Sequence, residues 1–145
     1  MSTKPQLVTL ALDLLQQRHE LVVEVVVLHT ALDRAAAAAA LQRLERSLSV
    51  GYSGVALRTI CLRGENGAPL ADVDSLFGAR EAFRVLYHEV KRAKAARRRV
   101  HLSIAGGRKI IAVYAMATAQ LLFDPDDRVW HIFSVPELIE RQALH

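Results

Sequence analysis

Cysteine is almost missing from this chain: Cys61 is the single cysteine among 145 residues, and it lies inside an apolar run. A disulfide within the chain is therefore excluded, and a reducing compartment is the expected environment. No histidine or acid stands next to Cys61 in the sequence. We therefore interpret Cys61 as a structural thiol of the core rather than as a nucleophile.

Long apolar runs, a secretory leader and the common cofactor motifs are missing as well. No stretch has the roughly 20 apolar residues of a membrane helix. We therefore expect a cytoplasmic protein, or one tethered to a membrane through a segment outside this sequence. The absence of Gly-x-Gly-x-x-Gly argues against a nicotinamide cofactor. No metal-ligand cluster or general-base pair is evident, and we expect neither a metal nor another cofactor.

What the chain does contain is typical of a single domain spanning residues 1–145. Apolar residues make up 52% of it and charged residues 23%, a length and composition sufficient for one hydrophobic core. The formal net charge is +4. A positive charge of this size permits a polyanionic ligand without requiring one.

Helical and strand patterns alternate along the whole chain. Helices are expected at residues 5–18, 31–48, 75–96, 109–123 and from 136 onward, and strands at residues 21–28, 55–62, 100–105 and 129–134. The first of these strands is expected to be buried on both faces. Thr30 is the expected cap of the second helix, and Asp72 or Asp74 that of the third. The alternation predicts a three-layer, Rossmann-like α/β domain with a mainly parallel sheet.

The stretch from His101 to Lys109 carries the clearest functional signal. It is expected to form a strand, a turn at Gly106-Gly107, and a helix whose first turn holds Arg108 and Lys109. Helix starts favour acids, because their free N–H groups carry partial positive charge. Two cations are reasonable there if an anion occupies the turn, which the glycines let it approach. The alternative is a tight turn with two solvated cations.

A second basic group closes the third expected helix. It consists of Lys91, Arg92, Lys94, Arg97, Arg98 and Arg99. Cations at a helix C-terminus interact favourably with the helix dipole. Few aromatic residues are interleaved with these cations, so we favour a solvated face over a nucleic-acid patch and expect no direct DNA binding.

Three stretches together resemble the CARF domain, the CRISPR-associated Rossmann fold. Residues 3–9 (Thr-Lys-Pro-Gln-Leu-Val-Thr) resemble the segment after that family's first strand. Residues 25–30 (Val-Val-Val-Leu-His-Thr) resemble its second strand and ligand-side loop, and residues 101–109 (His-Leu-Ser-Ile-Ala-Gly-Gly-Arg-Lys) its second ligand-binding motif. The likeness covers nearly the whole chain, and the order and spacing of the motifs are more specific than any one of them.

The resemblance implies a homodimer that binds a cyclic oligoadenylate, most often cyclic tetra-adenylate, a second messenger made by type III CRISPR complexes in antiviral defence. The ligand-binding residues it implies are Thr3, Lys4, Gln6, His29, Thr30, Ser103, Ala105, Gly106, Gly107, Arg108 and Lys109. His131, in the expected strand 129–134, could touch adenine or ribose like His29 and Thr30, but we favour its interpretation as a plain half-buried histidine.

The start of the chain departs from the family pattern, because the family's first strand should precede Thr3 and only two residues do. That strand would be missing here and belong to a longer protein whose front carries an effector or membrane segment. Alternatively, a partner chain supplies it, or the strands at residues 23–28 and 100–105 pair directly.

Two functions follow from the resemblance. The first is a sensor that binds the ring and signals to an effector. This chain shows neither the Arg-x-x-x-x-His set of a HEPN ribonuclease nor an Asp/Glu-Lys nuclease core, so the effector would lie outside it. The second is a metal-independent ring nuclease, in which a ribose 2′-hydroxyl attacks its own phosphate and Lys109 stabilises the developing charge. A third reading is an α/β domain for another nucleotide or phosphate.

Overall fold

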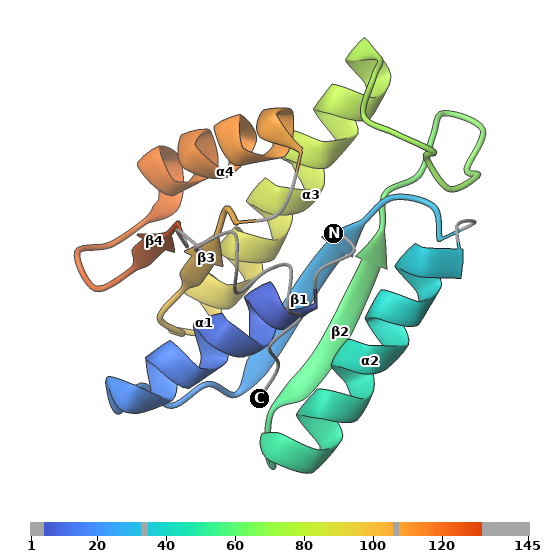
Figure 1. The fold of residues 1–145 in the computed structure, drawn as a ribbon. Helices are drawn as coiled ribbons and strands as arrows, with labels where there is room; N and C mark the ends of the chain where they lie inside the picture. The colour runs from blue at the N-terminus through green and yellow to red at the C-terminus, as the bar shows by residue number, and fades with distance from the viewer. Residues whose placement is uncertain (1–4, 33–34, 106–107, 132–145) are drawn as a thin grey trace. The chain divides into compact units, whose positions relative to one another are not determined.

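Helices and strands alternate in the computed structural model, which describes residues 5–32, 35–105 and 108–131 (Figure 1). The chain divides into two compact units, one of residues 1–60 with 132–145 and one of residues 61–131. Each unit holds two helices and a two-stranded sheet within its described residues. The strands within each sheet run in the same direction. This arrangement confirms the predicted Rossmann-like α/β class.

The first unit is built from α1 (Gln6–Gln17), β1 (Glu24–His29), α2 (Ala35–Gly51) and β2 (Ala56–Cys61), and β1 pairs with β2. Its core joins all four elements: Leu12 of α1, Val27 of β1 and Leu44 of α2 are buried together, with Leu57 of β2 packed against them. Alternate residues of a strand share a face, and this places Val25 on the same side as Val27. The apolar spacing read from the sequence therefore builds this core directly.

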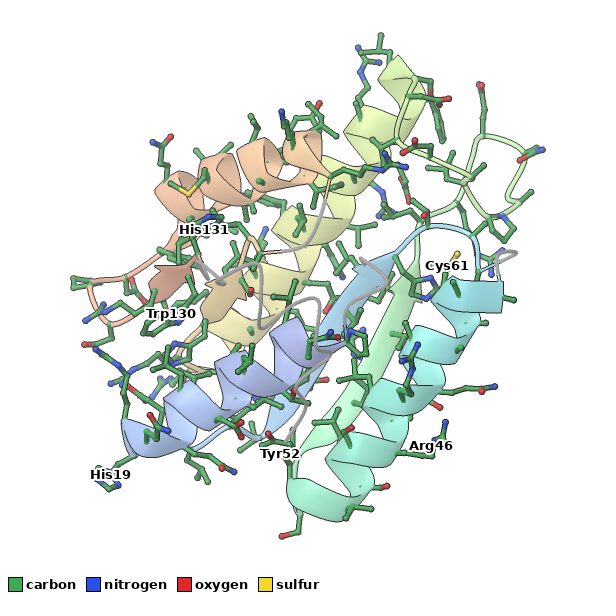
Figure 2. The ribbon with its side chains drawn as sticks, in the orientation of Figure 1. His19, Arg46, Tyr52, Cys61, Trp130 and His131 are labelled. Atoms are coloured by element: carbon green, nitrogen blue, oxygen red, sulfur yellow. The ribbon has the colours of Figure 1, made fainter. Side chains whose placement is uncertain are left out.

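A polar contact closes that core at the end of α2. The hydroxyl of Tyr52 donates to the carboxylate of Asp13, and it lies 3.3 Å from the backbone oxygen of Thr9. Burial and the neighbouring Asp13 carboxylate together raise the pKa of Tyr52 above its ordinary value. Tyr52, labelled in Figure 2, thus joins the end of α2 to α1.

The second unit is built from α3 (Leu76–Ala95), β3 (His101–Ser103), α4 (Lys109–Leu122) and β4 (Arg128–Trp130). The parallel pairing sets His101 opposite Arg128 and Ser103 opposite Trp130. α3 and α4 pack together, and each buries a small residue, Ala82 on α3 and Ala115 on α4. Such residues let two helix backbones approach closely.

Three details of the sequence reading are wrong. The second helix begins at Ala35 rather than 31, so Thr30 is not its cap. The cap of α3 is Ser75, whose side chain accepts a hydrogen bond from the amide of Gly78 at 3.0 Å. Strand 21–28 is not buried on both faces: Leu21 is 89% exposed and Val23 45% exposed. Within the part of the chain that the structure describes, β1 pairs with β2 alone, and the face that carries Val25 and Val27 packs into the core described above.

The remaining predictions about the fold meet different outcomes. Cys61 is half-buried rather than a core residue, because it ends β2 at the boundary of the apolar core, with its sulfur 3.6 Å from the carbonyl of Leu62 (Figure 2). Direct pairing of the strands at residues 23–28 and 100–105 stays a prediction, because the two strands belong to different units. The predicted strand 129–134 corresponds to β4 (Arg128–Trp130), and residues 132–134 and the helix predicted from 136 lie outside the described residues.

Candidate functional site

The candidate site lies where β3 ends and α4 begins. Parallel strands end at the same edge of a sheet, and α/β proteins bind their ligands at that edge. In this unit, Ser103 is the exposed last residue of β3 and Ala105 follows it half-buried. Arg108 is the N-cap of α4 and Lys109 its first residue. The predicted residues Gly106 and Gly107 between them lie outside the described part of the chain.

Neither the N-cap side chain nor the first turn of α4 offsets the partial positive charge at the start of this helix. Arg108 is in an extended conformation, and its side chain makes no cap hydrogen bond. No acid occupies the first turn, whereas α3 begins with the Ser75 cap. Lys109 is exposed and makes no ion pair with any residue that the structure describes. The first-turn amides, the helix dipole and the Lys109 cation therefore all place positive charge at this end of α4.

Arg108 has a partner that the sequence did not reveal. Its Nη2 atom lies 2.9 Å from Oδ2 of Asp72, in the loop before α3. The two side chains are 63% and 37% exposed. The other carboxylate oxygen of Asp72 accepts a hydrogen bond from the Val73 amide at 2.7 Å. From the sequence, Asp72 resembled a helix cap, and no local pattern connects it with Arg108.

The other predicted residues belong to the first unit. His29 is 7% exposed at the end of β1, and its Nδ1 lies 2.7 Å from the carbonyl oxygen of Thr30. A carbonyl only accepts, so Nδ1 is the donor and Nε2 of the neutral ring is left as an acceptor. Gln6, in the first turn of α1, is 8% exposed. Thr3 and Lys4 lie outside the described residues.

The family model for CRISPR-associated protein NE0113 matches residues 4–144, nearly the whole chain. The chain belongs to this CRISPR-associated family. No curated protein matches it. The membership confirms the CRISPR association that the resemblance implied, whereas the CARF assignment and its nucleotide ligand stay predictions.

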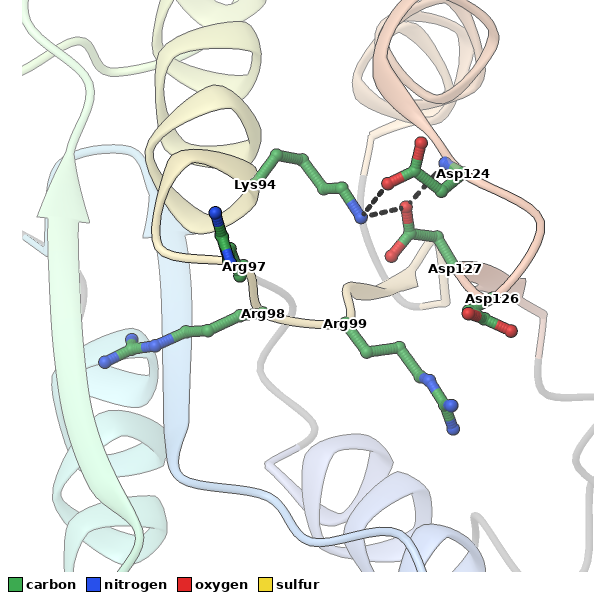
Figure 3. Close-up of a pocket in the computed structure, with 7 residues that line it drawn as sticks. All are labelled: Lys94, Arg97, Arg98, Arg99, Asp124, Asp126 and Asp127. Carbon is green, nitrogen blue, oxygen red and sulfur yellow. Dashed lines mark hydrogen bonds and ion pairs between the residues drawn. The ribbon is translucent and has the colours of Figure 1, made fainter.

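This CRISPR-associated protein has a second cluster of charge at the opposite edge of the β3–β4 sheet, where both strands begin. The cluster surrounds a hollow of about 350 Å³ (Figure 3). The hollow is lined by Lys94, Arg97, Arg98, Arg99, Asp124, Asp126 and Asp127. Its lining therefore combines lysine and arginine side chains with three carboxylates. Because the carboxylates partly neutralise the cations, the hollow is a poorer anion site than the start of α4.

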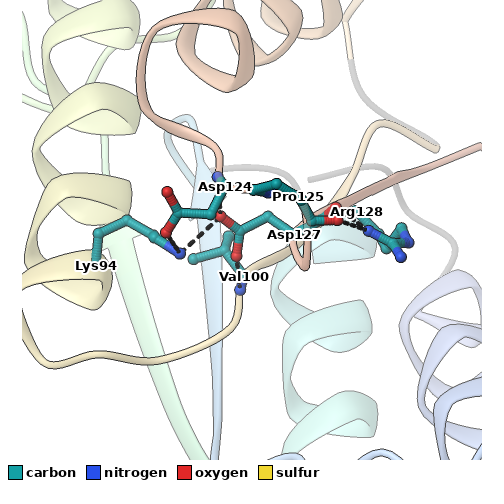
Figure 4. Close-up of polar contacts among 6 residues, drawn as sticks. All are labelled: Lys94, Val100, Asp124, Pro125, Asp127 and Arg128. Atoms are coloured by element: carbon teal, nitrogen blue, oxygen red, sulfur yellow. Dashed lines mark hydrogen bonds and ion pairs between the residues drawn. The ribbon is translucent and has the colours of Figure 1, made fainter.

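Asp127 explains why this second cluster is structural. Its side chain is fully covered and accepts hydrogen bonds at 2.7 Å from Lys94 Nζ and from the backbone amides of Val100 and Asp124 (Figure 4). Burial acts to raise the pKa of Asp127, but these hydrogen bonds outweigh it and lower that pKa. Hydrogen bonds from Lys94 to Asp124 and Asp127 raise the pKa of Lys94. Lys94 is therefore a bound structural cation, and its assignment to a solvated face is wrong.

The end of β4 carries two aromatic rings of this family member, Trp130 and His131, which Figure 2 labels. His131 follows β4 and is exposed, so its interpretation as half-buried is wrong. The indole nitrogen of Trp130 lies 2.9 Å from Nδ1 of His101.

Across the described ranges, no three potential metal ligands gather in one place. In those ranges, no helix combines the length and apolar character needed to span a bilayer.

Proposed function

We propose that this chain is a cyclic oligoadenylate sensor of a type III CRISPR system, with cyclic tetra-adenylate as the ligand and the turn between β3 and α4 holding its phosphates. One observation carries the proposal: α4 begins with Lys109, which makes no ion pair with any described residue, and has no acidic residue in its first turn. A helix start arranged in this way is unfavourable for the helix alone and favourable for a bound anion. Membership of a CRISPR-associated family supports the same ligand class.

The chemistry of a phosphodiester fits the groups at this turn. Each phosphate carries one negative charge and two oxygens that accept hydrogen bonds. Lys109 would donate to one of them, the first-turn amides of α4 would supply oriented donors, and the exposed Ser103 hydroxyl would supply another. Arg108 would add a planar, two-pronged donor once it leaves Asp72.

A homodimer would place two such turns around one ring. A cyclic tetranucleotide has even symmetry, so it presents the same phosphate pattern to both copies. Apolar exposure beside the site supports this arrangement. Val113 and Met116 are 59% and 43% exposed, and their spacing puts them on the same face of α4 as Lys109. Burying such a face against a second copy would bring the two Lys109 residues toward one axis.

The proposal is tested by titrating the protein with labelled cyclic tetra-adenylate and following both binding and the fate of the ring. Replacing Lys109→Ala is expected to weaken binding by at least tenfold, because a charged hydrogen bond to phosphate is worth about 1.5–3 kcal/mol. Lys91→Ala is the matched control, since Lys91 is another exposed lysine, on α3, and it should leave the affinity unchanged.

The outcomes separate the candidate functions. An intact ring recovered from a tight complex supports the sensor. Linear di-adenylate ending in a cyclic phosphate would identify the ring nuclease instead, with Lys109 stabilising charge during cleavage. If no oligoadenylate ring binds, or if Lys109→Ala binds as tightly as the parent, the turn is not the site.

A further inference from the structure

Asp72 stands at the place where an anionic ligand would meet Arg108. Its carboxylate is held from both sides, by the Val73 amide at 2.7 Å and by Arg108 at 2.9 Å. The loop that carries it is anchored at its base. The amide of Leu70 donates to the carbonyl of Leu62 at 2.8 Å, and the amide of Gly64 donates to the carbonyl of Ala68 at 2.7 Å. The carboxylate is therefore presented to Arg108 by a structured loop.

We propose that Asp72 is a built-in competitor that occupies Arg108 until a ligand phosphate replaces it. This inference rests on the proposed function, because it assigns the replacing anion to the nucleotide ring. A carboxylate and a phosphodiester each offer a guanidinium one negative charge and two acceptor oxygens. Only one side chain of this pair needs to move: Arg108 is 63% exposed and can turn to the ligand, while Asp72 keeps its bond to Val73.

The exposure of the pair sets the size of the effect. Ion pairs between exposed side chains are weak. A ligand phosphate can therefore replace Asp72 at Arg108, and the competition lowers the affinity for the ligand only a few-fold. Removing the competitor should therefore tighten binding by about two- to fivefold per copy of the site. A ring bound by two copies would gain the product of two such factors. Asp72 thus also selects ligands, since a neutral nucleoside offers Arg108 no charge in exchange.

The test compares Asp72→Asn with Asp74→Asn in the full chain, using labelled cyclic tetra-adenylate. Both variants remove one negative charge from the same loop, but Asp74 is exposed and pairs with no cation that the structure describes. Asp72→Asn should bind more tightly than the parent, while Asp74→Asn and the charge-retaining Asp72→Glu should match the parent. In an Arg108→Gln background, Asp72→Asn should lose its effect. Thermal melting establishes that every variant is folded.

Each outcome supports or overturns the proposal that Asp72 competes with the ligand for Arg108. Tighter binding by Asp72→Asn alone, or binding by Asp72→Asn when the parent does not bind detectably, supports the competitor. Equal or weaker binding by Asp72→Asn, beside a parent that binds, overturns the competitor and leaves the sensor function standing. If every variant fails to bind the ring, the proposed function is wrong, and this inference falls with it.

Discussion

At the scale of single residues, Asp127 shows how one buried charge orders the second unit. Its covered carboxylate receives Lys94 from α3, the Val100 amide before β3 and the Asp124 amide after α4. A buried carboxylate is tolerated only when its lone pairs are matched by donors, and here three segments supply them. The side chain therefore fixes where two strands begin.

We expect Asp127→Asn to lower the free energy of unfolding by about 3 kcal/mol at neutral pH, because an asparagine NH2 group cannot accept a hydrogen bond from the donors that now meet the buried carboxylate, and Lys94 keeps only the exposed Asp124 as a charged partner. The folded-state pKa of Asp127 is depressed, so its contribution is complete above the ordinary value of 3.8 and disappears as the pH falls through the lower folded value. Denaturant unfolding at several pH values measures the difference between the two proteins.

Asp126→Asn is the control for this substitution, since Asp126 is exposed in the same turn. It should change stability by less than about 0.5 kcal/mol. The pKa of Lys94 is raised in the folded protein, so its contribution to stability is complete below the ordinary value of 10.5 and is lost only as the pH rises through the higher folded-state pKa. Raising the pH moderately from neutrality should therefore cost no stability. A deficit of Asp127→Asn that is as large at pH 2 as at pH 7 would contradict the account.

At the scale of elements, the two helices of the second unit begin in opposite ways. α3 opens with the Ser75 cap and ends with Arg92 and Lys94 in its last turn, which suits the helix dipole. α4 opens with Arg108 and Lys109 and is followed by Asp124, which opposes the dipole at both ends. This reversed charge pattern is the reason for assigning ligand binding to α4.

Reversing the charge at the start of α4 should exchange function for stability. Lys109→Glu places an acid in the first turn and should raise the free energy of unfolding by about 0.5 kcal/mol. The same change should abolish binding of the nucleotide ring, because the carboxylate repels phosphate. Thermal unfolding and ligand titration of one preparation measure both effects. Lys91→Glu, well inside α3, should give no such gain, and a Lys109→Glu protein that is less stable than the parent would argue against the electrostatic reading.

At the scale of the whole molecule, the exposed apolar side chains of α4 support the homodimer proposed above. Val113, Met116 and Leu121 are 59%, 43% and 65% exposed. Between Lys109 and Asp124 the sequence contains no charged residue. A helix with little polar surface is rarely left in water along its length. The proposed ring symmetry gives this surface a partner that carries the same surface.

We expect the protein to sediment as a dimer and Val113→Asp to convert it to a monomer, because the new charge would be buried in the apolar contact. The variant should also lose affinity for the ring, since one copy would supply half of the phosphate donors. Val50→Asp on α2 is the matched control, because Val50 is 89% exposed and lies away from α4 in the sequence. A monomeric parent, with or without ligand, would rule out this interface.

The sequence by itself determined the order and type of the elements and the position of the turn before α4. Neighbours three or four residues apart share a helix face, and alternate residues share a strand face, so a linear pattern encodes each element. Spacing does not determine how far each apolar side chain of a helix is covered. On α3, Leu76 and Phe77 are 70% and 40% exposed, while Ala82 and Leu86 are buried.

Only the tertiary structure decided which charges meet. Lys94 and Asp127 are separated by 33 positions and are joined at 2.7 Å, and Arg108 meets Asp72 from a distant loop. Periodicity carries no record of such pairs, because their distance depends on how helices and loops pack rather than on spacing along the chain. The sequence therefore identified the cations at the start of α4, and folding determined that one of them already holds a carboxylate while the other has none among the described residues.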